Sequence, residues 1–187
     1  MITVKIPATS ANVGAGFDSL GLAVTLYNQI HLELAEKTEI ISLDHVEIPC
    51  DETNLVHTTM CSLFELCGQK MPPLRIGQVN HIPLSRGLGS SSACIIGGLL
   101  AANHIMGFPF SRQEMINLAA SIEGHPDNTT PALLGGFVSS VFDGKEVHYV
   151  RQELHVGIRF AALIPNFELR TSLARSVLPK RISHKDA

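Results

Sequence analysis

Residues 83–93 read Pro-Leu-Ser-Arg-Gly-Leu-Gly-Ser-Ser-Ser-Ala and connect a predicted strand at about 74–79 to a predicted helix at about 91–106. Gly87 and Gly89 can adopt positive φ angles and let backbone N–H groups approach a ligand without an intervening side chain. The first N–H groups of the helix have no internal partners, and the helix dipole places partial positive charge there. This turn therefore has the properties of an anion site, above all for phosphate.

Two familiar phosphate loops do not fit this turn. The Walker pattern needs Gly-Lys-Ser/Thr, and residues 83–93 contain no lysine. The dinucleotide fingerprint needs a third glycine where this chain has Ser92. A tight turn followed by a helix cap remains the plain structural alternative to a phosphate site.

The remaining patterns predict a mixed fold. Alternation of apolar and polar residues favours strands, and apolar residues three or four positions apart favour helices. Ser111 and Glu114 form a capping box before the helix predicted at 112–123. The strands are expected to form one mostly antiparallel sheet. Strands are predicted at 1–7, 30–34, 74–79, 136–142, 147–151 and 159–164, and helices at 54–67, 91–106, 112–123 and 172–177.

Composition excludes several classes of protein. With 45% apolar and 17% charged residues, the 187-residue chain has enough apolar surface for a core and is not expected to be disordered. A net charge of -3 disfavours nucleic acid as a partner. Because the chain has no apolar run of 18 residues and no recognisable secretion signal, no membrane association and a cytoplasmic location are expected. The four cysteines (Cys50, Cys61, Cys67, Cys94) are expected to be reduced thiols.

Four stretches carry a family resemblance. Pro-x-x-x-Gly-Leu-Gly-Ser-Ser-x-Ala at 83–93 resembles the ATP-phosphate motif of the GHMP small-molecule kinases. Pro-Ala-Thr-Ser-Ala-Asn-Val-Gly-Ala-Gly-Phe-Asp at 7–18 resembles the homoserine kinases within that group. Glu-Gly-His-Pro-Asp-Asn at 123–128 does so as well, and so does Thr-Ser-Leu-Ala-Arg at 171–175 with Leu-Pro at 178–179. Because the four matches occur in the same order, they favour that family.

The resemblance implies a fold, a reaction and a domain division. The fold would be α+β, the ribosomal-protein-S5-like N-terminal lobe of GHMP kinases, with a mixed, mostly antiparallel sheet and packed helices. Residues 1–179 would form the ATP-binding domain, and residues 180–187 would begin the connection to a C-terminal domain. Residues 176–187 contain no motif of that C-terminal domain. The reaction would be transfer of the ATP γ-phosphoryl group to L-homoserine, with Mg²⁺. A homodimer is an option that the resemblance leaves open.

The resemblance also implies a set of site residues. Asn128, Glu123 and Ser91 would be catalytic, and Ser91 and Glu123 would also bind Mg²⁺. The substrate would contact Asn12, Asp18, His125, Asp127, Asn128, Thr171 and Arg175. ATP would contact Asn54, Pro83, Leu84, Ser85, Arg86, Gly87, Leu88, Gly89, Ser90, Ser91, Ser92 and Ala93.

The residue types agree with these roles, although each has a simpler interpretation. Arg175 offers a planar fork for a carboxylate, and Asp18 or Asp127 could hold an ammonium. Alone, Asn12 and Asp18 are typical turn residues, Asn54 is a helix cap, and Glu123 is a solvated helix end. His125 is either a general base or a hydrogen-bonded loop residue. The short connection from Glu123 to His125 differs from the longer, glycine-rich one of other homoserine kinases.

Three rival functions stay open at this point. Another GHMP kinase, such as a mevalonate kinase, would share the phosphate motif but take a different acceptor. A lobe that binds nucleotide without catalysis would follow if the second domain were absent. An S5-like RNA-binding module is disfavoured by the acidic balance of the chain.

Overall fold

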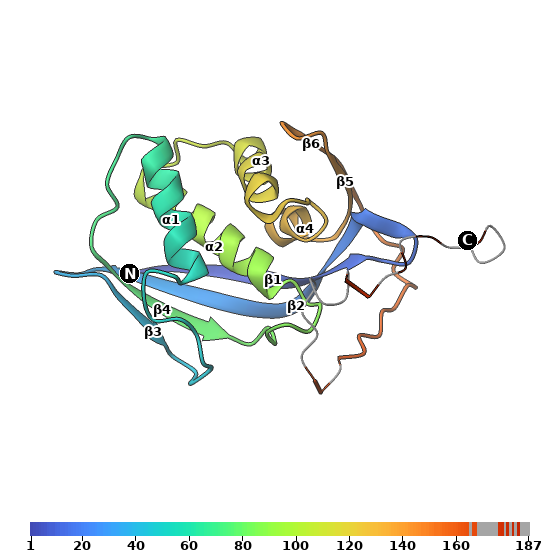
Figure 1. The fold of residues 1–187 in the computed structure, drawn as a ribbon, viewed down its shortest axis with the longest axis horizontal. Coiled ribbons are helices and arrows are strands. Elements are labelled where there is room, and N and C mark those ends of the chain that lie inside the picture. The colour runs from blue at the N-terminus through green and yellow to red at the C-terminus, as the bar shows by residue number, and fades with distance from the viewer. Residues whose placement is uncertain (165, 168–175, 178, 180, 182, 184–187) are drawn as a thin grey trace.

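In a computed structural model, the described residues form one mixed sheet with helices packed against it. The structure describes residues 1–164, 166–167, 176–177, 179, 181 and 183. In chain order, the elements are β1 (Ile2–Asn12), β2 (Gly16–Leu34), β3 (Glu39–Ser42), α1 (Leu55–Leu66), β4 (Leu74–Asn80), α2 (Ser90–Ile105), α3 (Arg112–Glu123), α4 (Thr129–Leu134), β5 (Phe137–Phe142) and β6 (Val147–Gln152). Figure 1 shows the helices together on one side of the sheet.

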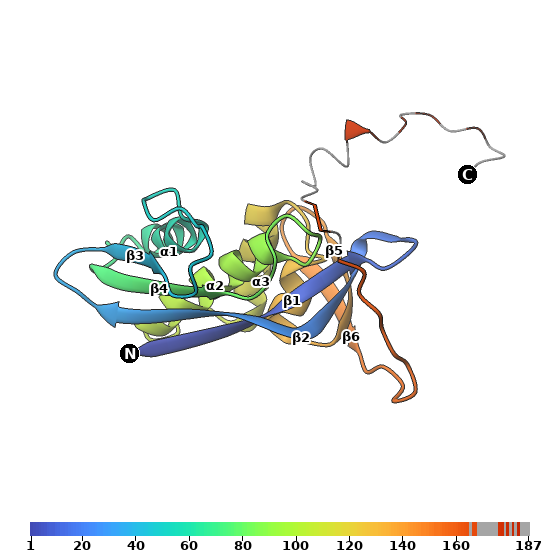
Figure 2. The same cartoon turned by 90° about the horizontal axis from the view of Figure 1, so that it is seen from below.

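The long strand β2 organises the six-stranded sheet. Along one edge β2 pairs with β1, and along the other it pairs first with β5 and then with β4. All strand pairs are antiparallel except β3 with β4. The view from below in Figure 2 shows β1 and β2 running beneath the helices. The predicted mixed, mostly antiparallel α+β fold is therefore confirmed.

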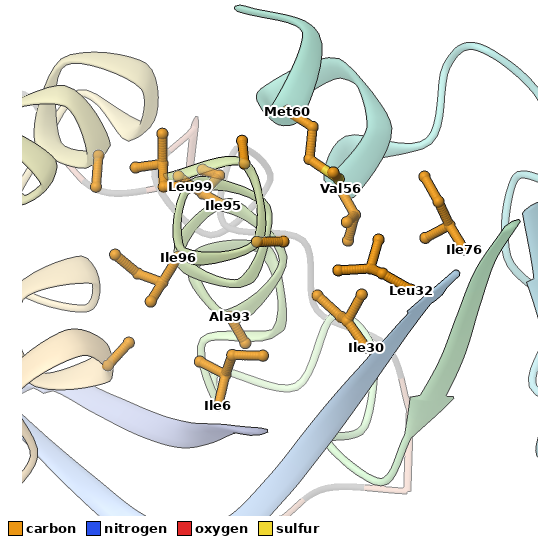
Figure 3. Packing of buried hydrophobic residues seen from close by; sticks show 14 of the residues in the cluster. Ile6, Ile30, Leu32, Val56, Met60, Ile76, Ala93, Ile95, Ile96 and Leu99 are labelled. Carbon is orange, nitrogen blue, oxygen red and sulfur yellow. The ribbon is translucent and has the colours of Figure 1, made fainter. Parts of the chain in front are cut away.

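Helix α2 is the centre of the core. Its Ile95, Ile96 and Leu99 are at most 2% exposed and are packed between the sheet and the other helices, as Figure 3 shows. A Cβ atom at Gly97 would lie 2.3 Å from the Ile30 side chain, and one at Gly98 would lie 2.9 Å from the Val56 carbonyl oxygen. Two adjacent glycines thus let β2 and α1 approach α2 closely. This packing fixes the position of the α2 N-terminus.

Local signals placed most helices correctly. The predicted helices at 54–67, 91–106 and 112–123 correspond to α1, α2 and α3. The predicted capping box is present, because the Ser111 side chain accepts from the Glu114 backbone and the Glu114 side chain accepts from the Ser111 backbone. Gly124 ends α3 in a left-handed conformation. These signals depend on residues within one helical turn of each other, so they could be recognised from the sequence.

The strand predictions were less complete. Only residues 30–34 of β2 were predicted, because the earlier part of that strand has register shifts and neighbours that obscure simple alternation. The short elements β3 and α4 were missed.

The predicted strand at 159–164 is wrong, because those residues pair with none of the described strands. Apolar side chains there, such as Leu163 at 96% exposure, face solvent. The predicted helix at 172–177 falls mainly on residues outside the described part.

Two further predictions concern the state of the cysteines and the absence of membrane-spanning segments. All four cysteines are free thiols, as predicted, although Cys50 is exposed. Within the described residues, no helix combines the length and the apolar character that a membrane crossing requires.

Candidate active site at the N-terminus of α2

The turn before α2 has the backbone geometry that the sequence predicted. Gly87 has φ 70°, and Gly89, the N-cap of α2, has φ 66° and ψ 31°. The N–H group of Ala93 donates to the Gly89 carbonyl oxygen at 2.9 Å and begins the helical ladder. The backbone N–H groups of residues 90–92 precede this bond and have no partner within the helix. Together with the helix dipole, they favour an anion at this end of α2.

The same turn is pressed against β1. A Cβ atom at Gly89 would lie 2.0 Å from Thr9 Oγ1 and 3.1 Å from Asn128 Oδ1. The backbone N–H of Thr9 donates to the Leu88 carbonyl oxygen at 3.1 Å. Only glycine fits position 89, both because of its positive φ angle and because no space exists for a side chain.

A polar cavity of about 560 Å³ opens at this turn. Its walls come from the end of β1, the turn before α2, the first turn of α2, the end of α3 and the loop before α4. The lining residues are Ala11, Asn12, Pro83, Ser85, Arg86, Gly87, Leu88, Gly89, Ser90, Ser91, Ser92, Glu123, His125, Asp127 and Asn128. The sequence contains four segments that resemble the kinase motifs, and residues from three of these segments meet in this cavity.

A larger cavity of about 840 Å³ lies between β2, the end of β6 and residues 153–164. Its lining is mainly apolar and includes Leu22, Phe137 and Phe160. We place the candidate site in the smaller cavity, because hydroxyls and amides that can bind a phosphate converge there with carboxylates that can bind a cation.

Glu123 lies at the N-terminus of α2 although it belongs to α3. The Ser91 hydroxyl lies 3.0 and 2.9 Å from the two Glu123 carboxylate oxygens, and the Ser92 hydroxyl lies 3.3 Å from Oε1. At the end of its own helix the carboxylate is unfavourable to the dipole, but at the start of α2 it is favourable. The charge conflict noted in the sequence is therefore resolved by the contact between the two helices.

The donors at this point fit a magnesium ion. Carboxylate and hydroxyl oxygens are the hard ligands that Mg²⁺ prefers, and the ion keeps several waters and phosphate oxygens as its other ligands. A phosphate bound at the α2 N-terminus would lie beside the negative Glu123 carboxylate. Since two anions at one helix end repel each other, a cation between them would lower the energy of the bound state. Ser91 and Glu123 are thus the residues that would hold the ion.

A second polar group forms near the loop before α4. The ligand atoms of Asp18, His125 and Asp127 all lie within 4.8 Å of one another, and this is the one such group of three found among the described residues. His125 Nδ1 lies 2.6 Å from Asp127 Oδ1, and Asp127 is only 1% exposed. The hydrogen bond to Asp127 raises the pKa of His125, against the opposing effect of burial. The carboxylates of Glu123 and Asp18 raise this pKa further.

Two asparagines complete the polar wall. Asn128 donates from Nδ2 to Asp127 Oδ1 at 3.4 Å, and its Oδ1 accepts from the Thr9 hydroxyl at 2.7 Å. Asn12, with φ 69°, ends β1 and accepts the backbone N–H of Asp18 at 2.9 Å through Oδ1. Asn12 therefore stabilises the turn, as its simpler interpretation held, and also lines the cavity.

Some predicted site residues lie elsewhere. Asn54 is 3% exposed and is the N-cap of α1, where its side chain accepts from the backbone N–H groups of Val56 and His57 and from Gln78. Its role as an ATP contact remains a prediction, as do those of Leu84 and Ala93, which do not line the cavity. Thr171 and Arg175 lie outside the described residues.

Sequence reasoning assigned no role to Thr9, although it lies inside one of the quoted motifs. Its side-chain partner is Asn128, which is 119 residues away in the chain. No local pattern signals such a contact.

Comparisons with known proteins show which families this chain resembles. Residues 54–136 match the family model described as the GHMP kinases N terminal domain. The chain is 51% identical, over its full length and 62% of the relative, to a homoserine kinase of Caldicellulosiruptor bescii. The crystal structure of a homoserine kinase from Cytophaga hutchinsonii superposes with a TM-score of 0.80 and 30% identity over 98% of this chain and 62% of that one.

A mevalonate kinase from Methanococcus jannaschii is more distant. The superposed region covers 81% of this chain and 56% of the mevalonate kinase, with a TM-score of 0.62 and 16% identity. At this identity the comparison shows a shared fold alone. The chain spans 62% of the length of the homoserine kinases named above. Residues 54–136 thus match the N-terminal domain of the GHMP kinases, and the chain as a whole is similar to homoserine kinases over 62% of their length.

Proposed function

We propose that this protein transfers the γ-phosphoryl group of ATP to the hydroxyl of L-homoserine and so produces O-phospho-L-homoserine for threonine synthesis. Support comes from relatives named homoserine kinase, including one that is 51% identical over the whole of this chain. Because the chain spans 62% of such relatives, the activity is a proposal for the whole protein.

One observation carries the proposal: a single cavity has two chemically different poles. At one pole lie the open N-terminus of α2 and the contact between Ser91 and Glu123. At the other lie His125, Asp127 and Asn128, with Asp18 next to them. A substrate that carries an ammonium and a hydroxyl, and a polyphosphate, could therefore lie end to end in one space.

At the phosphate pole, the main chain is suited to bind and orient ATP. The backbone N–H groups at residues 90–92 and the dipole of α2 would stabilise the phosphate charges. Mg²⁺, when bound by Ser91 and Glu123, would neutralise charge that develops on the transferred group. Phosphoryl transfer leaves little covalent chemistry to the protein, so positioning and charge stabilisation supply most of the rate.

At the acceptor pole, the buried Asp127 and the nearby Asp18 suit the ammonium of an amino acid. Asn128 lies between this pole and the phosphate turn, where it can hold the reacting hydroxyl. The resemblance assigns the substrate carboxylate to Arg175 and Thr171, and a planar guanidinium matches a carboxylate through two parallel hydrogen bonds.

An ADP-release assay with competing acceptors tests this function. We expect turnover with L-homoserine to exceed turnover with serine, threonine and mevalonate at equal concentration. Serine carries its hydroxyl one carbon closer to the ammonium, and mevalonate has no ammonium for the acidic pole. Faster turnover with mevalonate would identify another GHMP kinase. Calorimetric binding of ATP without turnover of any acceptor would instead indicate a lobe that binds nucleotide only.

The location and assembly of the protein belong to the same proposal. We expect it in the cytoplasm, where ATP and amino acids are available, and a homodimer is the assembly to test. Size-exclusion chromatography with light scattering would distinguish a dimer from a monomer of 20.2 kDa for this chain.

A further inference from the structure

We propose that Thr9 is a positioning residue whose hydroxyl holds the Asn128 side-chain amide in place for phosphoryl transfer. The inference rests on the proposed function, because it gives Asn128 its role at the acceptor pole. Thr9 lies on β1, next to the phosphate turn, and is completely buried.

The direction of the hydrogen bond follows from the chemistry of the two groups. Thr9 Oγ1 lies 2.7 Å from Asn128 Oδ1, and an amide oxygen can only accept, so the hydroxyl donates. On its other side, Asn128 Nδ2 donates to the Asp127 carboxylate, which accepts only. The Asp127 carboxylate therefore selects this amide orientation, and the Thr9 hydroxyl, which can donate or accept, holds the amide in it. Rotation of the amide by a half turn would place its NH₂ group against Thr9 and its oxygen against a carboxylate.

This orientation decides what Asn128 can offer to a ligand. With Oδ1 held by Thr9 and one N–H directed at Asp127, the second N–H on Nδ2 is a donor that remains for an acceptor hydroxyl. Asn128 would then bind the oxygen of that hydroxyl and hold it in position, rather than accept the hydroxyl proton. The orientation is therefore part of the alignment on which phosphoryl transfer depends.

The backbone and the side chain of Thr9 have separate partners. The backbone N–H binds the Leu88 carbonyl oxygen and so secures the phosphate turn, whereas the hydroxyl binds Asn128. A substitution of the side chain can therefore remove the bond to Asn128 and leave the bond to the turn. Thr9→Val does this with nearly the same volume, and Thr9→Ser retains the hydroxyl.

Thr130 provides a matched control on the neighbouring helix α4. Like Thr9 it is completely buried, but its hydroxyl has no hydrogen-bond partner among the described residues. Thr130→Val thus removes a buried threonine hydroxyl without loss of such a bond. It tests whether any change caused by Thr9→Val comes from the bond to Asn128 rather than from burial of an extra methyl group.

Steady-state kinetics on the whole enzyme test the role directly. We expect Thr9→Val to lower kcat with L-homoserine by about tenfold, because the half-buried amide of Asn128 then keeps only its long bond to Asp127 and is no longer held in one position. The KM for ATP should stay within about twofold, Thr9→Ser should restore most of kcat, and Thr130→Val should match the wild type. In an Asn128→Ala background, Thr9→Val should cause no further loss. An equal loss of kcat in Thr9→Val and Thr130→Val would overturn this role of Thr9. A further loss of kcat from Thr9→Val in the Asn128→Ala background would overturn it as well.

A spectroscopic measurement keeps the inference testable without activity. The side-chain NH₂ resonances of Asn128 can be assigned by their disappearance in Asn128→Ala. We expect them to shift in Thr9→Val, to return in Thr9→Ser and to remain unchanged in Thr130→Val. Unchanged resonances in Thr9→Val would contradict the orientation itself. If the resonances shift in Thr9→Val but the wild-type enzyme does not phosphorylate homoserine, the proposed function is refuted while the contact between Thr9 and Asn128 stands.

Discussion

Substitution of Gly89 by alanine separates the two reasons for glycine in the phosphate turn. Gly87 and Gly89 have nearly the same positive φ, 70° and 66°. A Cβ atom at Gly87 would meet no atom within 4 Å, whereas one at Gly89 would lie 2.0 Å from Thr9 Oγ1. Gly87→Ala therefore introduces backbone strain alone, and Gly89→Ala introduces the same strain together with a steric conflict.

The size of each effect follows from this geometry. An alanine in the left-handed region costs roughly 1 kcal/mol, which should be the whole loss at Gly87. At Gly89, the completely buried Thr9 has to move and its bond to Asn128 is disturbed. Forcing extra volume into packed surroundings adds about 1–3 kcal/mol. We therefore expect Gly89→Ala to lower the free energy of unfolding by about 2–4 kcal/mol in total.

Equilibrium unfolding in urea measures both variants under the same conditions. The difference between their free energies of unfolding isolates the steric conflict, since the φ strain is common to both. Gly89→Ala should also weaken ATP binding in calorimetry, because the turn cannot keep its position between β1 and α2. If the two variants lose the same stability within about 0.5 kcal/mol, the close packing of Gly89 against Thr9 is refuted.

Two further predictions concern the carboxylate and the histidine of the cavity. Glu123→Gln should lower turnover and raise the Mg²⁺ concentration needed for half-maximal rate, because a neutral amide is a weaker ligand than a carboxylate. Glu65→Gln, at an exposed position, is the control. An unchanged Mg²⁺ dependence in Glu123→Gln would show that Glu123 does not bind the metal. For His125, the bond to Asp127 raises the folded pKa above 6.5, so the stabilisation is complete below about pH 6.5 and declines as the pH rises through the folded pKa. The stability lost in His125→Gln, measured by urea unfolding, should thus be larger at about pH 5.5 than at about pH 9. A loss that grows with pH would contradict the ionised pair.

Short-range patterns were enough to predict the elements that support the site. The glycines and serines at 87–92 predicted a turn with positive φ followed by a helix, and both are present in the structure. Ser111 and Glu114 predicted the start of α3, and Gly124 predicted its end. Strand β2 was predicted only at 30–34, because two register shifts in its pairing with β1 break the alternation on which the prediction depended.

The residues of the site were named from a family resemblance, and their mutual geometry was not predicted. Asn54 illustrates the difference, since its simpler interpretation as a helix cap is what the structure contains. Glu123 illustrates the opposite case. Its unfavourable position at the end of α3 was visible in the sequence, but the hydroxyl that it contacts, on Ser91, is 32 residues away.

The sequence by itself determined the turn before α2 and the helix caps, because backbone conformations and capping bonds depend on residues a few positions apart. Only the tertiary structure decided that Glu123 lies at the start of α2 and that Thr9 contacts Asn128 across 119 residues. Such contacts form when the packing of α2 against the sheet brings distant segments together. Their energy depends on distances that no local pattern encodes.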